Sequence, residues 1–128
     1  MSVAMTVAGL LGSSSIRVGE HDGFAVVTVR GEIGRAMVPG LRDVLSWAID
    51  NHPGVVVDLA GATGIDRDGL ALLLQSQDRA FLRHSEICFA QPAPSLLAAL
   101  ERLQADAMFL MADDCSTALK QLRDGTRV

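Results

Sequence analysis

The feature that most constrains this chain is a short apolar run, Val55-Val-Val-Asp-Leu59, bounded by Pro53-Gly54 before it and Gly61 after it. An apolar run of this length between turn-forming residues is typical of a β-strand that is covered on both faces. We therefore expect residues 54–59 to form a central strand of a sheet, followed by a loop over residues 61–64.

The segments before this run predict a hairpin and a helix. The strand-like segments Ile16–Gly19 and Phe24–Arg30 are separated by a turn that ends in Gly23, which indicates two antiparallel strands. Apolar residues then repeat at helical spacing from Leu41 to Ile49, which predicts an amphipathic helix that ends near Asn51.

The segments after the run continue this alternation. They predict a helix over 69–83, a strand over 86–90, a helix from Pro94 to about Gln104, a strand over 107–111, and a terminal helix capped by Asp113 or Asp114. Helices that alternate with strands are typical of parallel pairing through right-handed crossovers. The expected fold class is α/β: one mixed sheet of about five strands, with an antiparallel N-terminal hairpin, parallel later strands and helices mainly on one face.

The length of the chain limits the number of domains it can form, and its charge limits the classes of partner it can bind. The 128 residues fit one domain, which we assign to residues 16–122, with a flexible leader over 1–15 and a polar tail over 123–128. Fifteen acidic residues against eleven basic ones, with no Lys/Arg-rich stretch, argue against a direct nucleic-acid partner. No apolar run is long enough for membrane insertion.

The two cysteines, Cys88 and Cys115, do not make a disulfide framework, so we expect a reducing, cytoplasmic location and free thiols. Cys88 lies in an apolar strand, where a thiol usually packs as a small hydrophobe. Cys115 lies in the first turn of a predicted helix, where a thiol can have a lowered pKa and higher reactivity. The sequence leaves a redox role for either thiol open.

Catalytic and cofactor motifs are absent from the sequence, so we expect no enzyme activity and no cofactor. Asp58, Asp66 and Asp68 should lie near the C-terminal edge of the sheet, where α/β proteins place their sites, and they could be read as a metal site. A simpler interpretation is that Asp66 or Asp68 caps the following helix through a backbone N–H group.

The stretch from Val55 to Leu74 resembles the signature of STAS domains, the family of bacterial anti-sigma factor antagonists. In that family an apolar strand ending in Asp-Leu leads into Asp-Ser-Ser/Thr-Gly-Leu at the head of a helix; here that motif reads Asp66-Arg-Asp-Gly-Leu70. Val29-Arg-Gly-Glu-Ile33 is similar to the family's Gly-Glu-Leu-Asp segment, and Phe89-Ala-Gln-Pro-Ala-Pro94 to its Val-Asn-Pro-Ser-Pro. The resemblance runs from about Ile16 to Leu122.

The resemblance implies a non-enzymatic switch protein that binds an anti-sigma factor of the serine-kinase type and so frees a sigma factor for transcription. In the family, phosphorylation of the serine after the motif Asp turns the antagonist off. The partner-binding surface that it implies comprises Glu32, Ile33, Gly34, Asp66, Arg67, Asp68, Gly69 and Leu70.

This sequence departs from the family pattern at two positions. Arg67 stands at the phosphoacceptor position and has no hydroxyl group, and Gly34 stands where the family has Asp. A cation in the first turn of a helix opposes the helix dipole by about 0.3 to 1 kcal/mol at an exposed site. Arg67 is therefore either an exposed residue screened by the neighbouring acids or a residue that contacts an acidic partner surface.

Three outcomes stay open within this interpretation: an antagonist that is always competent, one controlled by other means, and one that has lost kinase binding. Two other functions also stay open. One is a STAS-like accessory subunit of a membrane transport complex, and the other is a small metal-dependent enzyme that uses Asp58, Asp66 and Asp68. The sequence also leaves open which sigma and anti-sigma factors are involved and whether the chain forms a homodimer.

Overall fold

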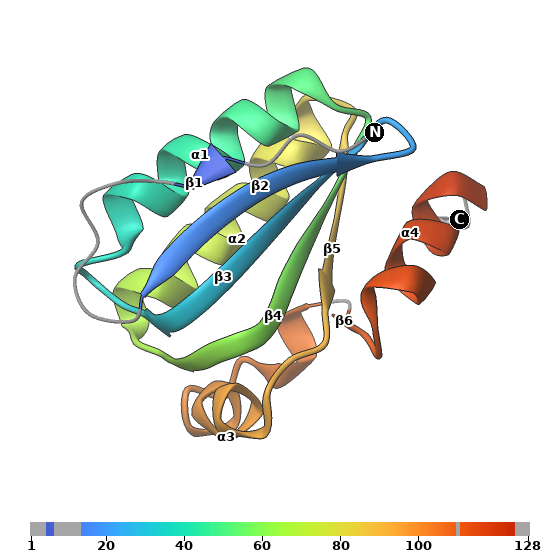
Figure 1. Cartoon of the computed structure of the whole chain (residues 1–128). Helices are drawn as coiled ribbons and strands as arrows, with labels where there is room; N and C mark the ends of the chain where they lie inside the picture. The colour runs from blue at the N-terminus through green and yellow to red at the C-terminus, as the bar shows by residue number, and fades with distance from the viewer. Residues whose placement is uncertain (1–4, 7–13, 110, 125–128) are drawn as a thin grey trace.

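The computed structural model describes residues 5–6, 14–109 and 111–124, which form a single sheet with strands in the order β1-β2-β3-β4-β5-β6 (Figure 1). The first three strands pair antiparallel, and the pairs from β3 to β6 are parallel. The strands are β1 Met5–Thr6, β2 Ser15–His21, β3 Phe24–Ile33, β4 Gly54–Ile65, β5 Glu86–Ala90 and β6 Met111–Ala112.

Helices pack on both faces of this sheet. Helices α1 and α2 lie side by side on one face, whereas α4 lies on the other (Figure 1). The helices are α1 Val38–Asn51, α2 Arg67–Leu82, α3 Pro94–Arg102 and α4 Cys115–Asp124, with a short 3-10 helix, η1, at Asp106–Met108. The α/β class, the antiparallel start and the parallel later strands are confirmed. Within the described part of the chain, no helix is long and apolar enough to cross a membrane.

The predicted hairpin and central strand are confirmed. The hairpin turn consists of Asp22 and Gly23, which both have positive φ angles (53° and 84°), as a two-residue type I′ turn requires. In β4, Val55, Val56 and Val57 are all fully buried. Val55 and Val57 belong to the main core with α1 and α2, while Val56 belongs to a smaller core with residues of α4.

The predicted loop over residues 61–64 is wrong, because β4 continues through it to Ile65. The parallel pairing with β3 extends to Ile33↔Ile65 and includes two register shifts. Glycine-rich sequence is typical of loops, but here the neighbouring strand supplies hydrogen-bond partners for the backbone, and the shifts absorb the irregularity. The long β3–β4 pair carries the end of β3 to the start of α2.

The predicted strand over residues 107–111 is also wrong. Met108 N–H donates to the Ala105 carbonyl in the turn of η1, and the described residues that pair with β5 are Met111 and Ala112. Within this apolar run Phe109 is buried and packs edge-on against Phe89 with ring centroids 5.1 Å apart, whereas Met108 is 52% exposed. The terminal helix is confirmed, and Asp114 caps it by accepting from the Thr117 N–H at 2.7 Å.

The ends of the chain differ in part from the expected leader and tail. Met5–Thr6 pairs with β2 as β1, and Ser15 is the first residue of β2, so these residues belong to the sheet. The remainder of the expected leader, except Ser14, lies outside the described residues. At the other end, α4 includes Arg123 and Asp124, and residues 125–128 lie outside the described residues.

Candidate functional site

Two segments that are more than thirty positions apart in the chain meet at one end of the sheet: Glu32–Gly34 at the end of β3 and Asp66–Leu70 at the start of α2. The pairing Ile33↔Ile65 brings them together, and the Asp66 N–H donates to the Ile33 carbonyl at 3.3 Å. All eight residues that the sequence grouped into one surface therefore come from two adjoining segments, which we call the β3–α2 junction.

The side chain of Asp66 joins these two segments. Its Oδ1 accepts a hydrogen bond from the Gly69 N–H at 2.9 Å, which is the helix cap that the sequence predicts. Its Oδ2 accepts from the Arg35 N–H at 3.2 Å, across the junction. One carboxylate thus stabilises the start of α2 and holds the loop after β3 against it.

Two glycines of the junction leave room for close neighbours: Gly69 for the backbone of Ile33 and Gly34 for the carboxylate of Asp66. A Cβ atom on Gly69 would lie 1.8 Å from the Ile33 carbonyl oxygen, and one on Gly34 would lie 2.8 Å from Asp66 Oδ2. A side chain at position 34 would therefore press against the capping carboxylate of Asp66. Glycine at position 34 leaves room for the Asp66 carboxylate to accept both of its hydrogen bonds.

The residues of the junction differ in what they offer to a partner. Ile33, Gly34 and Gly69 are buried, and Asp66 and Leu70 are half-buried, so these five serve mainly to hold the two segments together. The exposed residues are Glu32, Arg67 and Asp68. Their side chains are the part of the junction that another molecule can contact.

Arg35 is a site residue that the sequence reasoning missed. Its Nε lies 3.4 Å from Asp68 Oδ2, but the two side chains are 90% and 55% exposed, so the pair contributes little to stability. The only sequence signal was its place two residues after Ile33. Asp68 also lies in the first turn of α2, where a negative charge is favourable.

Arg67 is exposed and makes no ion pair or side-chain hydrogen bond with any residue in the described part of the chain. The carboxylates of the two neighbouring acids contact other groups. Asp66 accepts hydrogen bonds from the N–H groups of Gly69 and Arg35, and Asp68 lies near Arg35 Nε. Of the two interpretations of Arg67, this geometry favours the one in which its guanidinium is available to a partner.

Asp58 does not join Asp66 and Asp68. Its Oδ1 accepts from the Ala60 N–H at 3.0 Å, and its carboxylate lies near the thiol of Cys115 in α4. Among the residues that the structure describes, no three His, Cys, Asp or Glu side chains form a group that could hold a metal ion. The three carboxylates of the metal hypothesis are therefore not assembled into one site.

Both thiols are free and neither is activated. Burial, followed by the negative charge of Asp58, raises the pKa of Cys115 from its ordinary value of 9.0 to about 11. Burial also raises the pKa of Cys88. The lowered pKa considered for Cys115 at a helix start is wrong, because desolvation and a nearby carboxylate outweigh the helix dipole.

We expect the stability of the protein to fall between pH 9 and pH 11, with a contribution from Cys115. Below pH 9 the thiol is neutral in both states; above it the unfolded chain loses the proton while the folded protein keeps it, so the free energy of unfolding decreases. Allowing for solvent screening, the contribution is about 1 kcal/mol by pH 10. Urea unfolding at pH 8 and pH 10 measures it. Cys115→Ser should show a smaller decrease than wild type, and an identical decrease would contradict the assignment.

Comparison with known proteins came from a family model and from solved structures. A family model described as "Mlab, STAS domain" matches residues 16–112. None of the curated proteins compared with the chain matches it.

Three solved structures share the fold. An anti-sigma factor antagonist from Mycobacterium paratuberculosis is 22% identical with a TM-score of 0.70, over 94% of this chain and 95% of that one. An anti-sigma-factor antagonist (STAS) domain protein from Planctomyces limnophilus is 16% identical with a TM-score of 0.71, over 84% and 97%. The Bacillus anti-sigma factor antagonist SpoIIAA, in its unphosphorylated form, is 15% identical with a TM-score of 0.71, over 85% and 96%.

Proposed function

Because the chain belongs to the STAS domain family, we propose that it is an anti-sigma factor antagonist. In this role it binds an anti-sigma factor of the serine-kinase type, displaces the sigma factor and frees it for transcription. The proposed activity is binding in the cytoplasm, without catalysis and without a cofactor.

The observation that carries this proposal is the β3–α2 junction itself. The Asp66 carboxylate and the close contact of Gly69 with Ile33 hold the two motif segments in a fixed arrangement. Glu32, Arg67 and Asp68 are displayed on it as exposed charged side chains. A preformed surface with charges of both signs is suited to selecting a protein partner through electrostatic complementarity.

We further propose that this antagonist is not switched by phosphorylation at the start of α2. Arg67 occupies the acceptor position, and the next residue, Asp68, has no hydroxyl group either. Of the two nearest hydroxyl groups along the chain, that of Ser76 is buried and donates to the Leu72 carbonyl at 2.9 Å, while Thr63 is exposed on β4. The position that the family modifies is therefore permanently cationic.

We expect wild-type protein to bind its kinase-type partner and to take up no phosphate at residue 67, whereas Arg67→Ser accepts one phosphate there. A phosphate at the N-terminus of α2 is stabilised by free N–H groups and the helix dipole, but the fixed charge of Asp68 should slow the transfer. Incubation with ATP followed by intact-mass measurement and peptide mapping gives the readout.

Arg67→Ala is the matched control, because it removes the same charge without adding a hydroxyl group and should remain unmodified. Phosphorylation of wild type at Thr63 or Ser76 would show that the switch lies at another residue. A Thr63→Ala variant then identifies which hydroxyl group is used.

The partner is best identified by capture from native lysate followed by mass spectrometry. Recovery of a kinase-type anti-sigma factor supports the proposal, especially if Arg67→Glu, which reverses the exposed charge, reduces its recovery. Recovery of an ATPase of a membrane transport complex instead would replace the proposal with the accessory-subunit function.

A further inference from the structure

Helices α1 and α2 lie side by side on one face of the sheet (Figure 1), and a cavity of about 340 Å³ lies between them near the start of α2. A second cavity of about 150 Å³ lies further along the same two helices. Arg42, Leu72 and Gln75 line both cavities, so the two lie next to each other. We call this feature the α1–α2 groove.

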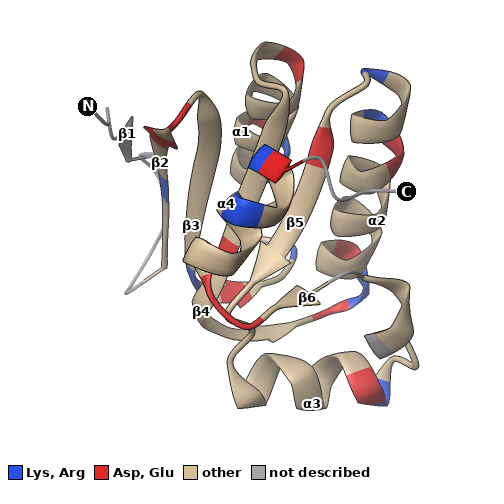
Figure 2. Cartoon of the chain, turned by 90° about the vertical axis from the view of Figure 1, so that its right-hand side faces the viewer, with Lys and Arg blue, Asp and Glu red and all other residues tan. Residues whose placement is uncertain are grey.

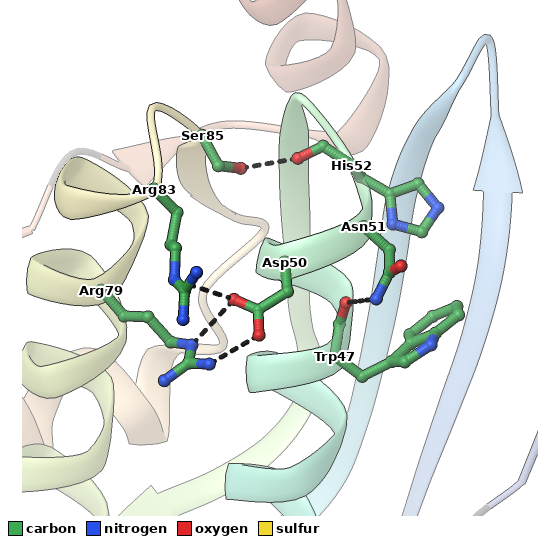
Figure 3. Close-up of polar contacts among 7 residues, drawn as sticks. All are labelled: Trp47, Asp50, Asn51, His52, Arg79, Arg83 and Ser85. Carbon is green, nitrogen blue, oxygen red and sulfur yellow. Dashed lines mark hydrogen bonds and ion pairs between the residues drawn. The ribbon is translucent and has the colours of Figure 1, made fainter.

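An ion pair lies at each end of the groove. At the end beside the β3–α2 junction, Arg35 contacts Asp68. At the other end, Figure 3 shows Asp50 of α1 facing Arg79 of α2 and Arg83, the residue that follows α2. Arg79 binds Asp50 through two contacts, Nη2 to Oδ2 at 2.6 Å and Nε to Oδ1 at 3.0 Å, and Arg83 Nε lies 3.5 Å from Oδ1.

Arg79 is held by two close contacts with Asp50, whereas the side chain of Arg35 has the exposed contact with Asp68. The hydrogen bond from Arg79 is the main reason that the pKa of Asp50 lies below its ordinary value, so this carboxylate is charged at neutral pH. Asp68 is the one acid among the described residues that line the groove, and its Oδ2 faces Arg35.

Arg42 lies between the two ends and is different. It is exposed, lines both cavities, and makes no ion pair with any residue that the structure describes. Next to it, Leu72 forms an apolar floor that is 3% exposed, and the amide of Gln75 offers a further hydrogen-bond donor. Three of the chain's eleven basic residues line this groove, although the chain as a whole has a net charge of −4.

We propose that the α1–α2 groove binds an acidic segment of a protein partner, with a carboxylate on Arg42 and a neighbouring apolar side chain on Leu72. The guanidinium presents a fork of donors that matches a carboxylate, and this pairing is strong and directional. A volume of about 340 Å³ is at the lower end of the range for ligand sites, which suits a few side chains of an extended segment.

Asp68 lines the groove and also belongs to the β3–α2 junction, so the two adjoin. A partner seated on the junction can therefore extend an acidic segment along the groove. In this respect the inference rests on the proposed function, because it supplies a second contact for the same partner. The binding of an acidic segment as such depends only on the groove.

The first experiment uses the full chain and a defined probe. A capped peptide of alternating Glu and Leu is titrated into isotope-labelled protein, and backbone amide shifts are followed by NMR. We expect the largest shifts at residues 38–46 and 71–79, and about tenfold weaker binding for Arg42→Glu. Arg102→Glu is the matched control, because it makes the same charge change at an exposed position of α3.

The peptide experiment overturns the proposal under either of two results: equal weakening by Arg42→Glu and Arg102→Glu, or equal binding of a peptide in which Gln replaces Glu. Arg42→Ala, which keeps helix propensity high, guards against a variant that fails to fold. Its melting curve should match that of wild type, and its binding should be reduced.

The second experiment separates this inference from the proposed function. If the partner captured by wild type is recovered equally well by Arg42→Glu, the groove is not part of the interface and the inference fails while the function stands. If no anti-sigma factor is captured but the acidic peptide binds as described, the proposed function fails and the groove remains a site for acidic segments.

Discussion

Val56→Asp is expected to leave the chain unfolded at neutral pH. Val56 has no exposed surface and pairs with Val26 of β3 and Cys88 of β5. The buried residues around it form a small apolar cluster that includes Ala118 of α4, together with Cys88, Ala90 and Ala112, and this cluster contains no cation. An unpaired carboxylate there costs several kcal/mol, a large share of a typical stability of about 5 to 15 kcal/mol.

Far-UV circular dichroism and thermal melting measure this loss. Ala60→Asp is the matched control, because it introduces the same carboxylate on the same strand at an exposed position and should leave the melting curve nearly unchanged. A cooperative transition of Val56→Asp at the wild-type temperature would contradict the burial of β4 between two layers of helices.

Gly69→Ala is expected to destabilise the protein by about 3 kcal/mol and to disrupt the β3–α2 junction. The added methyl group would lie 1.8 Å from the Ile33 carbonyl oxygen, so the backbones of β3 and α2 must move apart. That movement breaks the hydrogen bond from Asp66 N–H to Ile33 and disturbs the cap that Asp66 makes with Gly69.

A loss of stability would be informative, because replacing Gly by Ala within a helix normally increases stability by about 1 kcal/mol. Gly64→Ala is the matched control: its Cβ would lie 3.8 Å from Glu32 Oε2, which is ordinary contact. Urea unfolding should show a large loss for Gly69→Ala only. A gain in stability for Gly69→Ala would show that the junction is looser than the structure has it.

Local sequence patterns were sufficient for most of the elements. The Asp22-Gly23 turn, the helical spacing from Leu41 to Ile49 and the apolar strand over 86–90 each predict an element that the structure has. The two element errors, at 61–64 and 107–111, have different causes. Pairing with β3 makes the first segment a strand, whereas a local turn, with Met108 N–H bonded to the Ala105 carbonyl, occupies the start of the second.

The candidate site also combines a local contact that the sequence predicts with a distant contact that it does not. The cap by Asp66 could be predicted, because its partner Gly69 is only three residues away. The second bond of Asp66, to Arg35, joins residues 31 positions apart and left no pattern in the sequence. Whether the junction binds an anti-sigma factor stays a prediction that the capture experiment addresses.

The order of strands and helices from β2 to α4, the central place of β4, the cap of α2 and the absence of a hydroxyl group at Arg67 follow from the amino-acid sequence, because each leaves a local pattern of residues. The α1–α2 groove, the isolation of Arg42 in it, and the raised pKa of Cys115 were decided only by the tertiary structure. Burial and charge pairing depend on which distant segments of the chain come into contact. In this protein those contacts are set by how the helices pack on the two faces of the sheet.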